Sequence, residues 1–444
     1  MRKNTVSMTQ GNIYSGMLLF ALPVFMGNLF QQFYSVVDSL IVGNYLGSQA
    51  LAAVSSSGNL IYLLVGFFQG ISMGGGVIIS RYFGAKNYDG LEKSIHVSIG
   101  FGIIASVLLT LVGFFFAPVI LTLMNTPLSV LPDSITYFQI YFLGSFGFVM
   151  YNIFVGILQA VGDSKTPLIY LIISSVINIV LDLIFIGFLH YGVGAAALAT
   201  IISQFISAFL CFFKLSFTKQ VYKVRLSSIR LEKEMLLQIF SIGIPAGFQN
   251  SIISFANIVV QSNINGFGEL AMAGCGAYSK IEGFMMLPVT SFTLALTTFV
   301  SQNIGANKMD RVKKGAKFGI LCSMILAQFI GVLTYFFAPY LISLFDTTPE
   351  VIILGTGRAQ ASALFFFLAA YSHCVGAILR GAGNSKTPMV VLFLSWCLLR
   401  VSILVLLKPI FPTIDLVYWV YPITWAFSSV LFYYFYQTRI DLAK

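Results

Sequence analysis

Charged residues are scarce in this sequence. Asp, Glu, Lys and Arg together make up 9% of its 444 residues, whereas 58% of the residues are hydrophobic. A soluble globular domain carries roughly 25% charged residues, so a water-facing surface of ordinary area cannot be built from this chain. The mean hydropathy of +0.90 instead predicts an integral membrane protein whose apolar side chains continue outward to lipid.

Cysteine and histidine are also scarce, which excludes two common kinds of site. The three histidines and the five dispersed cysteines form no C-x-x-C pair, so zinc sites and a disulfide framework are not predicted. The net charge of +10 does not call for nucleic acid, because basic loops held on one side of a membrane explain it. The cysteines are Cys211, Cys275, Cys322, Cys374 and Cys397.

Long apolar stretches dominate what is present. A helix that crosses a bilayer needs about 20 apolar residues, and the first such stretch continues to about Leu40, too far for the core of a cleaved signal peptide. We therefore predict an all-α polytopic membrane protein with twelve transmembrane helices. The predicted spans are 14–40, 51–80, 95–117, 135–160, 167–188, 193–215, 236–263, 271–300, 316–337, 357–380, 388–407 and 416–437.

The distribution of basic residues predicts the orientation. With a cytoplasmic N-terminus, all but four of the 25 lysines and arginines fall in segments between spans on the cytoplasmic side, as basic loops generally do. The four exceptions, at outer or intramembrane positions, are Lys280, Arg358, Arg400 and Lys408. We expect both termini to be cytoplasmic.

Short motifs recur at a constant spacing of 221 residues. Phe116–Pro118 recurs as Phe337–Pro339, and Ser164–Pro167 recurs as Ser385–Pro388. At the same spacing Ser80–Ala85 meets the related run Ser301–Ala306. Repeats with one period indicate duplication. We predict two pseudo-symmetric six-helix lobes, 1–213 and 236–444, joined by a cytoplasmic linker, 214–235; parallel repeats of this kind are typical of transporters that work by alternating access.

Three acidic residues lie well inside the predicted spans: Asp38, Asp182 and Glu282. An ionisable side chain at the bilayer centre costs roughly 2.5–3.5 kcal/mol, so such residues usually serve a function. Asn178 lies four residues before Asp182 and shares its helix face. Two nearby carboxylates in a low-dielectric interior hold a proton or recruit a cation between them. We therefore predict a cation or proton site at Asp38 and Asp182, with neutral oxygens from Asn178 and Thr200.

Three further features have open or weaker interpretations. Glu282 is either a structural partner of Arg400 or a carboxylate that faces a substrate cleft, and the role of Lys280 beside it is open. Pro23 and Pro245 lie early in the first helices of the two lobes. Because proline kinks a helix, both are candidate hinges.

With these residues laid out, the chain resembles the multidrug and toxic compound extrusion (MATE) family. The resemblance covers nearly the whole chain, and the order and spacing of its motifs carry it. The matching stretches are Gln31–Gly43, Leu46–Gly47, Ala50–Val54, Gly156–Pro167, Asn178, Asp182 and Gln302–Ala306.

The resemblance implies export of amphipathic, often cationic, compounds in exchange for Na⁺ or H⁺ across a prokaryotic plasma membrane. In the prokaryotic branch with an ion site in the first lobe, the ion-binding residues fall on Asp38, Asn178, Asp182 and Thr200. The substrate-lining residues fall on Gln31, Tyr34, Asn152 and Gln204, to which we add Glu282. Other members carry an acid on the tenth helix; Ala369–His373 has none, so no ion site is implied in the second lobe.

The partners follow from the same resemblance. We expect a monomer that contacts membrane lipid and a small amphipathic molecule, binds no nucleic acid, needs no cofactor besides the coupling ion, and is not an enzyme. The alternative within transport is a flippase for a lipid-linked sugar or peptidoglycan precursor, which would need several basic residues for pyrophosphate. An intramembrane aspartyl protease built on Asp38 and Asp182 would leave the duplication unexplained.

Overall fold

The computed structural model describes residues 6–124 and 126–440, and its helices group into two compact units. Of the described residues, unit 1 comprises 6–7 and Leu22–Gly247, and unit 2 comprises Met8–Ala21 and 248–440. Within the described residues there is no β-strand, so the all-α prediction is confirmed.

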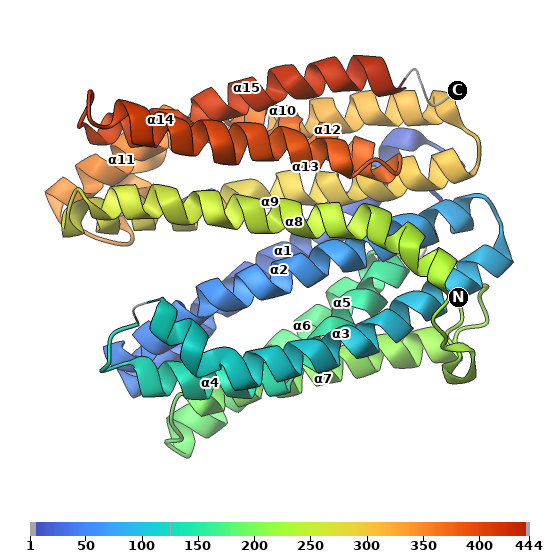
Figure 1. The fold of residues 1–444 in the computed structure, drawn as a ribbon, viewed down its shortest axis with the longest axis horizontal. Helices are drawn as coiled ribbons and strands as arrows, with labels where there is room; N and C mark the ends of the chain where they lie inside the picture. The colour runs from blue at the N-terminus through green and yellow to red at the C-terminus, as the bar shows by residue number, and fades with distance from the viewer. Residues whose placement is uncertain (1–5, 125, 441–444) are drawn as a thin grey trace. The chain divides into compact units, whose positions relative to one another are not determined.

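Unit 1 is a bundle of helices that run alongside one another (Figure 1). Helix α5 packs against α2, α3 and α7, and α7 also packs against α4 and α6. The elements that lie entirely in this unit are α2 (Ser48–Gly84), α3 (Tyr88–Leu123), α4 (Leu131–Leu143), α5 (Ser145–Ala160), α6 (Lys165–Asp182), the π-helical turn η1 (Leu183–Phe188), α7 (Gly194–Phe217) and the short 3₁₀ turn η2 (Leu226–Ser228).

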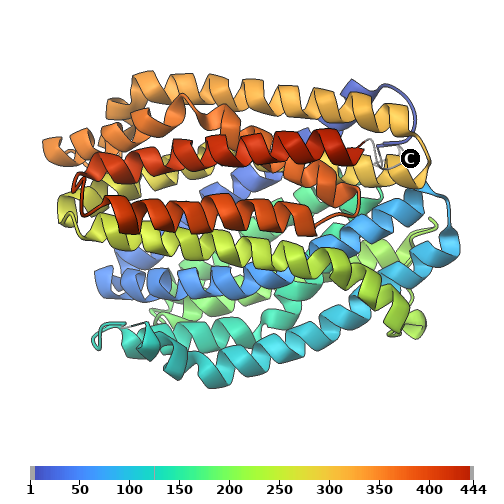
Figure 2. The ribbon, with the colours of Figure 1, turned by 45° about the horizontal axis from the view of Figure 1, so that its top comes forward.

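Unit 2 repeats this arrangement with its own helices, coloured yellow to red in Figure 2. Helix α9 packs against α10, α11 and α12, and α15 packs against α11 and α12. The elements are α9 (Glu269–Gly305), α10 (Met309–Ser343), α11 (Pro349–Ala363), α12 (Phe366–Gly381), α13 (Lys386–Leu392), the π-helical turn η3 (Phe393–Leu399), α14 (Arg400–Leu407) and α15 (Ile414–Ile440).

Two bent helix pairs account for the predicted number of spans. Among the described residues, ten helices are long and apolar enough to cross a bilayer, and the number rises to twelve if each bent pair is one span. The pairs are α4 with α5, bent by 51°, and α11 with α12, bent by 54°. They coincide with the predicted spans 135–160 and 357–380, so the polytopic fold with twelve spans is confirmed.

The backbone repeats with the same period as the sequence motifs. Gly162 and Gly383 both adopt positive φ angles, of 89° and 92°, and so do Lys86 and Asn307, both at 56°. The residue after each of these glycines then caps the next helix. Asp163 Oδ1 accepts from the Thr166 N–H at 3.0 Å, and Asn384 Oδ1 accepts from the Thr387 N–H at 3.1 Å. The duplication therefore extends to turn geometry and capping.

Two long helices, α1 (Ile13–Leu46) and α8 (Lys233–Asn265), each contribute to both units. Helix α1 changes unit between Ala21 and Leu22, next to Pro23. Helix α8 changes unit between Gly247 and Phe248, two residues after Pro245. The contacts between residues thus divide the two units inside α1 and α8. The predicted lobes, by contrast, are separated by the linker between residues 213 and 236.

Hydrogen bonds hold the chain just before each of these helices. In unit 2, Arg311 Nη1 donates to the Gly11 carbonyl at 2.9 Å, and Asn303 Nδ2 donates to the Met8 carbonyl at 3.0 Å. In unit 1, the Arg225 N–H donates to His96 Nε2 at 3.0 Å. The linker predicted at 214–235 also buries Tyr222 in the core of unit 1.

Close glycine contacts hold the first part of α8 against α2 within unit 1. A Cβ atom built on Gly70 would lie 2.2 Å from the backbone nitrogen of Gly247, and one on Gly74 would lie 2.6 Å from that of Gly243. Only residues without a side chain permit such an approach, as in other closely packed membrane helices.

Gly70→Ala is therefore expected to lower the melting temperature of the detergent-purified protein by several degrees. Alanine normally stabilises a helix by about 0.5–1 kcal/mol relative to glycine, but here its methyl group would collide with backbone, and overpacking costs about 1–3 kcal/mol. Gly276→Ala in α9 is the matched control, because nothing lies within 4 Å of its Cβ position. A Gly70→Ala protein that melts at or above the wild-type temperature would contradict this packing.

Candidate functional site

The fifth span of unit 1 presents two buried polar side chains on one face. Asn178 and Asp182 lie on α6, one helical turn apart, and both side chains are fully buried. Asp182 is the last residue of α6, and the π-helical turn η1 begins at the next residue. Single π-helical turns inside α-helices are frequent at functional sites, and this one adjoins a buried acid.

Helix α1 brings a second carboxyl group to the same place. Asp38 lies in the part of α1 that belongs to unit 1, and its carboxyl group lies close enough to that of Asp182 for the two to interact directly. The Oδ1 atom of each aspartate is buried without a hydrogen-bond partner in the protein. Two carboxyl groups thus meet with one unsatisfied oxygen each.

Asn178 and Thr200 complete the surroundings of this pair. With the amide of Asn178 oriented by its hydrogen bonds, Nδ2 donates to Asp182 Oδ2 at 3.0 Å and Oδ1 accepts from the Thr200 N–H at 3.2 Å. The Thr200 hydroxyl donates to the Ala196 carbonyl at 3.0 Å. The structure therefore brings together all four residues predicted for the ion site: Asp38, Asn178, Asp182 and Thr200.

Tyrosines border the pair of acids. Tyr34, predicted to contact substrate, lies one turn before Asp38, and its side chain lies close to that of Thr200. Tyr137 of α4 also lies close to both carboxyl groups and stacks on Tyr141, with ring centroids 6.4 Å apart. Sequence reasoning missed Tyr137, because a tyrosine in an apolar span carries no signal that separates a site residue from a core residue.

This arrangement is suited to a single small cation or a proton. Two adjacent carboxyl groups in a low-dielectric interior do not both keep their negative charge unless a positive ion lies between them or one of them is protonated. Among the residues that the structure describes, no three His, Cys, Asp or Glu side chains cluster as metal ligands. The groups that could bind an ion here are thus the two carboxyl groups and neighbouring neutral oxygens.

Three further residues predicted to contact substrate lie on α1, α5 and α7. Gln31 is exposed on α1. Asn152 donates to the Phe148 carbonyl of its own helix at 2.9 Å. Gln204 on α7 has a buried Oε1 atom without a hydrogen-bond partner. No contact joins these three side chains into one surface, so their role in substrate binding stays a prediction.

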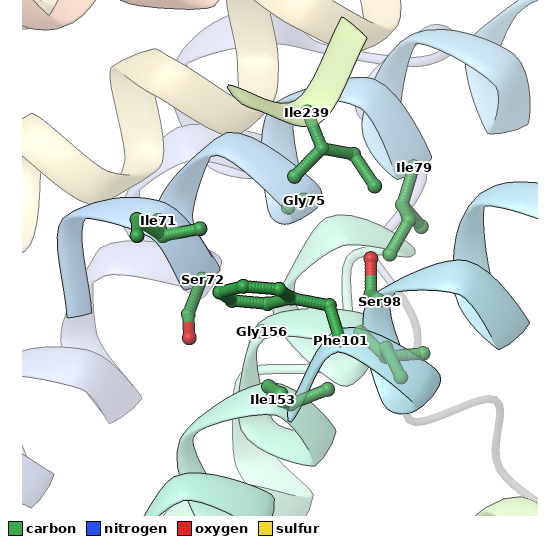
Figure 3. Close-up of a pocket in the computed structure, with 11 residues that line it drawn as sticks. Ile71, Ser72, Gly75, Ile79, Ser98, Phe101, Ile153, Gly156 and Ile239 are labelled. Atoms are coloured by element: carbon green, nitrogen blue, oxygen red, sulfur yellow. The ribbon is translucent and has the colours of Figure 1, made fainter. Parts of the chain in front are cut away.

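One small cavity lies inside unit 1 (Figure 3). Its volume is about 10 Å³, and Ser72, Ser98, Phe101 and Ile153 are among its lining residues. That space suffices for roughly one water molecule. It does not offer room for a drug-sized compound.

Unit 2 contains the third predicted acid. The Glu282 carboxylate pairs with Arg358 of α11 at 3.8 Å, so the pairing considered with Arg400 is corrected, although Arg400 lies near enough to act on Glu282 electrostatically. Lys280 is exposed. Of the four bases assigned to outer or intramembrane positions, Arg358 and Arg400 are buried, and they lie near each other.

Comparison with known protein families identifies the same duplication. The family model described as MatE matches residues 23–184 and again residues 245–406. The two matches begin at Pro23 and Pro245, the prolines at which α1 and α8 change unit.

Individual relatives agree along the whole chain. The probable multidrug resistance protein YoeA of Bacillus subtilis is 31% identical over 447 residues, covering 98% of this chain and 95% of that protein. The probable multidrug resistance protein YpnP of the same organism is 31% identical and covers 88% of each. A solved structure titled as the outward-facing conformation of a multidrug resistance MATE family transporter superposes with a TM-score of 0.90 at 21% identity, covering 99% of this chain and 98% of that one.

Asp182→Asn is expected to abolish the increase in melting temperature that Na⁺ or H⁺ gives the purified protein. A ligand that binds only the folded state raises the melting temperature in proportion to the logarithm of its concentration. The measurement is the melting temperature in a Na⁺ titration balanced with choline and, separately, in a pH series. Asp89→Asn is the control, since this carboxylate is largely exposed at 78%. An Asp182→Asn protein that still responds as the wild type does would show that the ion binds elsewhere.

Proposed function

This chain belongs to the MATE family, and on that premise we propose that it is a secondary antiporter that exports amphipathic compounds in exchange for Na⁺ or H⁺. The relatives YoeA and YpnP carry the name of multidrug resistance proteins, which supports drugs and other toxic compounds as the exported class. The observation that carries the antiport proposal is the pair of facing carboxyl groups, Asp38 and Asp182, each with one unsatisfied buried oxygen.

The cation is a co-substrate in this proposal. In the outward-facing state the ionised carboxylates attract one Na⁺ or H⁺ from outside, with Asn178 and Thr200 supplying neutral groups. Binding cancels one of the two negative charges and favours the state that has released its drug. Coupling of this kind requires that ion and drug prefer different conformations, because a ligand of equal affinity for both states shifts nothing.

The membrane potential supplies enough free energy for this exchange. One positive charge that moves inward gains about 2.3 kcal/mol per 100 mV. Because each 1.4 kcal/mol corresponds to a factor of ten, that is about a fifty-fold accumulation of a neutral compound outside. An ion gradient across the membrane adds to this driving force.

Helix α1 links ion binding to the rest of the molecule. Its first turns belong to unit 2, whereas Asp38 lies on the part that belongs to unit 1. Proline removes one intrahelical hydrogen bond and allows a helix to bend. A change at Asp38 is therefore transmitted along α1 to Pro23, and Pro245 has the corresponding position in α8.

A flippase for a lipid-linked precursor is the second transport candidate. The buried Arg358 and Arg400 of unit 2 favour an anionic ligand, which such a precursor has. One of these arginines is already paired with Glu282. The positive charge that remains is too small to balance the negative charge of a pyrophosphate. Drug export therefore stands as the proposed function, in a bacterial membrane, with both termini cytoplasmic and the protein monomeric.

Asp38→Asn is expected to abolish ion-driven transport. In everted membrane vesicles that contain the wild-type protein, an imposed Na⁺ gradient or an imposed pH gradient should drive uptake of ethidium or a fluoroquinolone; the gradient that works identifies the ion. The variant cannot carry the second negative charge and should fall to the rate of vesicles without the protein. Asp89→Asn should behave as wild type. Wild-type rates in Asp38→Asn would remove this mechanism.

Pro23→Ala is expected to reduce transport severalfold without lowering the melting temperature. Alanine restores the missing hydrogen bond and favours a straight α1, so that the bend needed during the cycle becomes rarer. Pro118→Ala, in the interior of α3 and away from the change of unit, is the control. Equal transport by Pro23→Ala and wild type would exclude Pro23 as a hinge.

A further inference from the structure

The interior of unit 2 carries more positive than negative charge. Three arginines are buried there, with exposed fractions of 4% for Arg358, 6% for Arg380 and 1% for Arg400. In the described part of the chain, the one ion pair that these side chains form is that of Arg358 with Glu282, at 3.8 Å. The buried charges of unit 1 are by contrast acidic, since Asp163 and Asp182 are buried and Asp38 adjoins Asp182.

Two of the arginines share one aromatic ring. The guanidinium carbons of Arg358 and Arg400 lie 5.2 and 4.4 Å from the centre of the Tyr421 ring. Further rings lie against them, with Tyr278 at 5.4 Å from Arg358 and Trp396 at 5.6 Å from Arg400. Such cation–π contacts stabilise a guanidinium group without neutralising its charge.

The hydrogen bonds of Arg400 go to neutral groups. Its Nη1 donates to Asn257 Oδ1 at 3.3 Å and its Nη2 to the Thr424 hydroxyl at 3.0 Å. The Nε atoms of Arg400 and Arg358 are both buried without a partner. An ionised side chain that keeps an unsatisfied donor in a low-dielectric interior lowers the free energy of unfolding. Packing contacts alone do not offset this loss.

Two side chains that contact the buried arginines reach the surface of the unit. The Glu282 side chain is 22% exposed, and Asn257, which contacts Arg400, is exposed on α8. Arg400 also follows directly on the π-helical turn η3, as Asp182 directly precedes η1. Each unit thus carries a buried charge beside a π-helical turn in its fifth span, and the sign of that charge differs.

The chemistry of the cluster identifies its ligand. Two guanidinium groups and one carboxylate leave one net positive charge, which one carboxylate of a ligand would balance. The planar guanidinium fork matches a carboxylate in shape, and the surrounding tyrosine and tryptophan rings suit a flat aromatic body. A permanently cationic dye without an acidic group gains nothing from the two guanidinium groups.

We propose that Arg358 and Arg400, arranged around Tyr421 in unit 2, form a subsite for the carboxylate group of an aromatic exported compound. This assignment rests on the proposed export function and adds a substrate class to it, namely aromatic acids and zwitterions. Glu282 occupies Arg358 when the subsite is empty and competes with the incoming carboxylate.

Arg400→Gln tests the subsite with three compounds in the everted-vesicle assay: a fluoroquinolone with a free carboxylate, its ethyl ester, and ethidium. The KM for the free acid should rise about tenfold or more, as expected when a charged hydrogen bond is lost. The KM values for the ester and for ethidium should stay within about twofold of wild type. Retained ethidium transport also shows that the variant is folded.

Glu282→Gln should have the opposite effect. Removal of the competing carboxylate leaves both guanidinium groups free for the ligand, so the KM for the free acid should fall severalfold while that for the ester is unchanged. Lys280→Gln is the matched control on the same helix, since it removes an exposed charge outside the cluster; it should leave all three KM values unchanged.

The outcomes separate this assignment from the export function itself. If the wild-type protein moves none of the three compounds under either gradient, the proposed function fails. If it moves them but Arg400→Gln alters acid and ester equally, or alters neither, the subsite is overturned. If Arg400→Gln and Arg400→Lys both fail to fold and Glu282→Gln leaves the KM for the acid unchanged, the cluster is structural and the subsite is likewise overturned.

Discussion

An ionisable side chain inside a bilayer is costly unless a partner satisfies it, and this constraint explains both clusters of polar residues described above. In unit 1 two carboxyl groups face each other, and each leaves one oxygen without a protein partner. A proton or a small cation is what such a pair lacks. In the proposed mechanism a bound ion would offset the free-energy cost of burying the two acids.

The duplicated halves have kept their backbone and diverged in charge. Turns with positive φ angles, a capping Asp163 matched by Asn384, and bent helix pairs recur in both units. At the 221-residue spacing, however, Asp38 and Asp182 correspond to Val259 and Ile403, which do not ionise. Backbone geometry is fixed by turns and packing, whereas a buried charge depends on single residues. The two halves can therefore differ in their buried charges and share one fold.

Much of the fold could be predicted from the sequence, because lipid exposure demands long apolar helices and a duplicated chain repeats its turns. The two acids of the proposed ion site, Asp38 and Asp182, could be named because acidic residues stand out in an apolar span. Tyr137 could not, since an aromatic residue is ordinary there. The pairing of Glu282 with Arg358 also escaped prediction, because the register between α9 and α11 depends on three-dimensional packing. The positions at which α1 and α8 change unit also escaped prediction, because they depend on three-dimensional contacts and the sequence repeat does not reveal them.

Two helices, α1 and α8, contribute to both units, and each carries a residue of one charge cluster. Helix α1 carries Asp38 in unit 1 while its first turns are tied to unit 2 through the chain that Arg311 and Asn303 hold. Helix α8 begins against α2 in unit 1 and carries Asn257, the partner of Arg400, in unit 2. Each helix therefore packs in one unit at one end and carries a residue of a charge cluster in the other unit, with a proline near the change of unit. A displacement at either cluster acts on a helix that both units share, and a shared rigid element of this kind can carry a coupling free energy between sites.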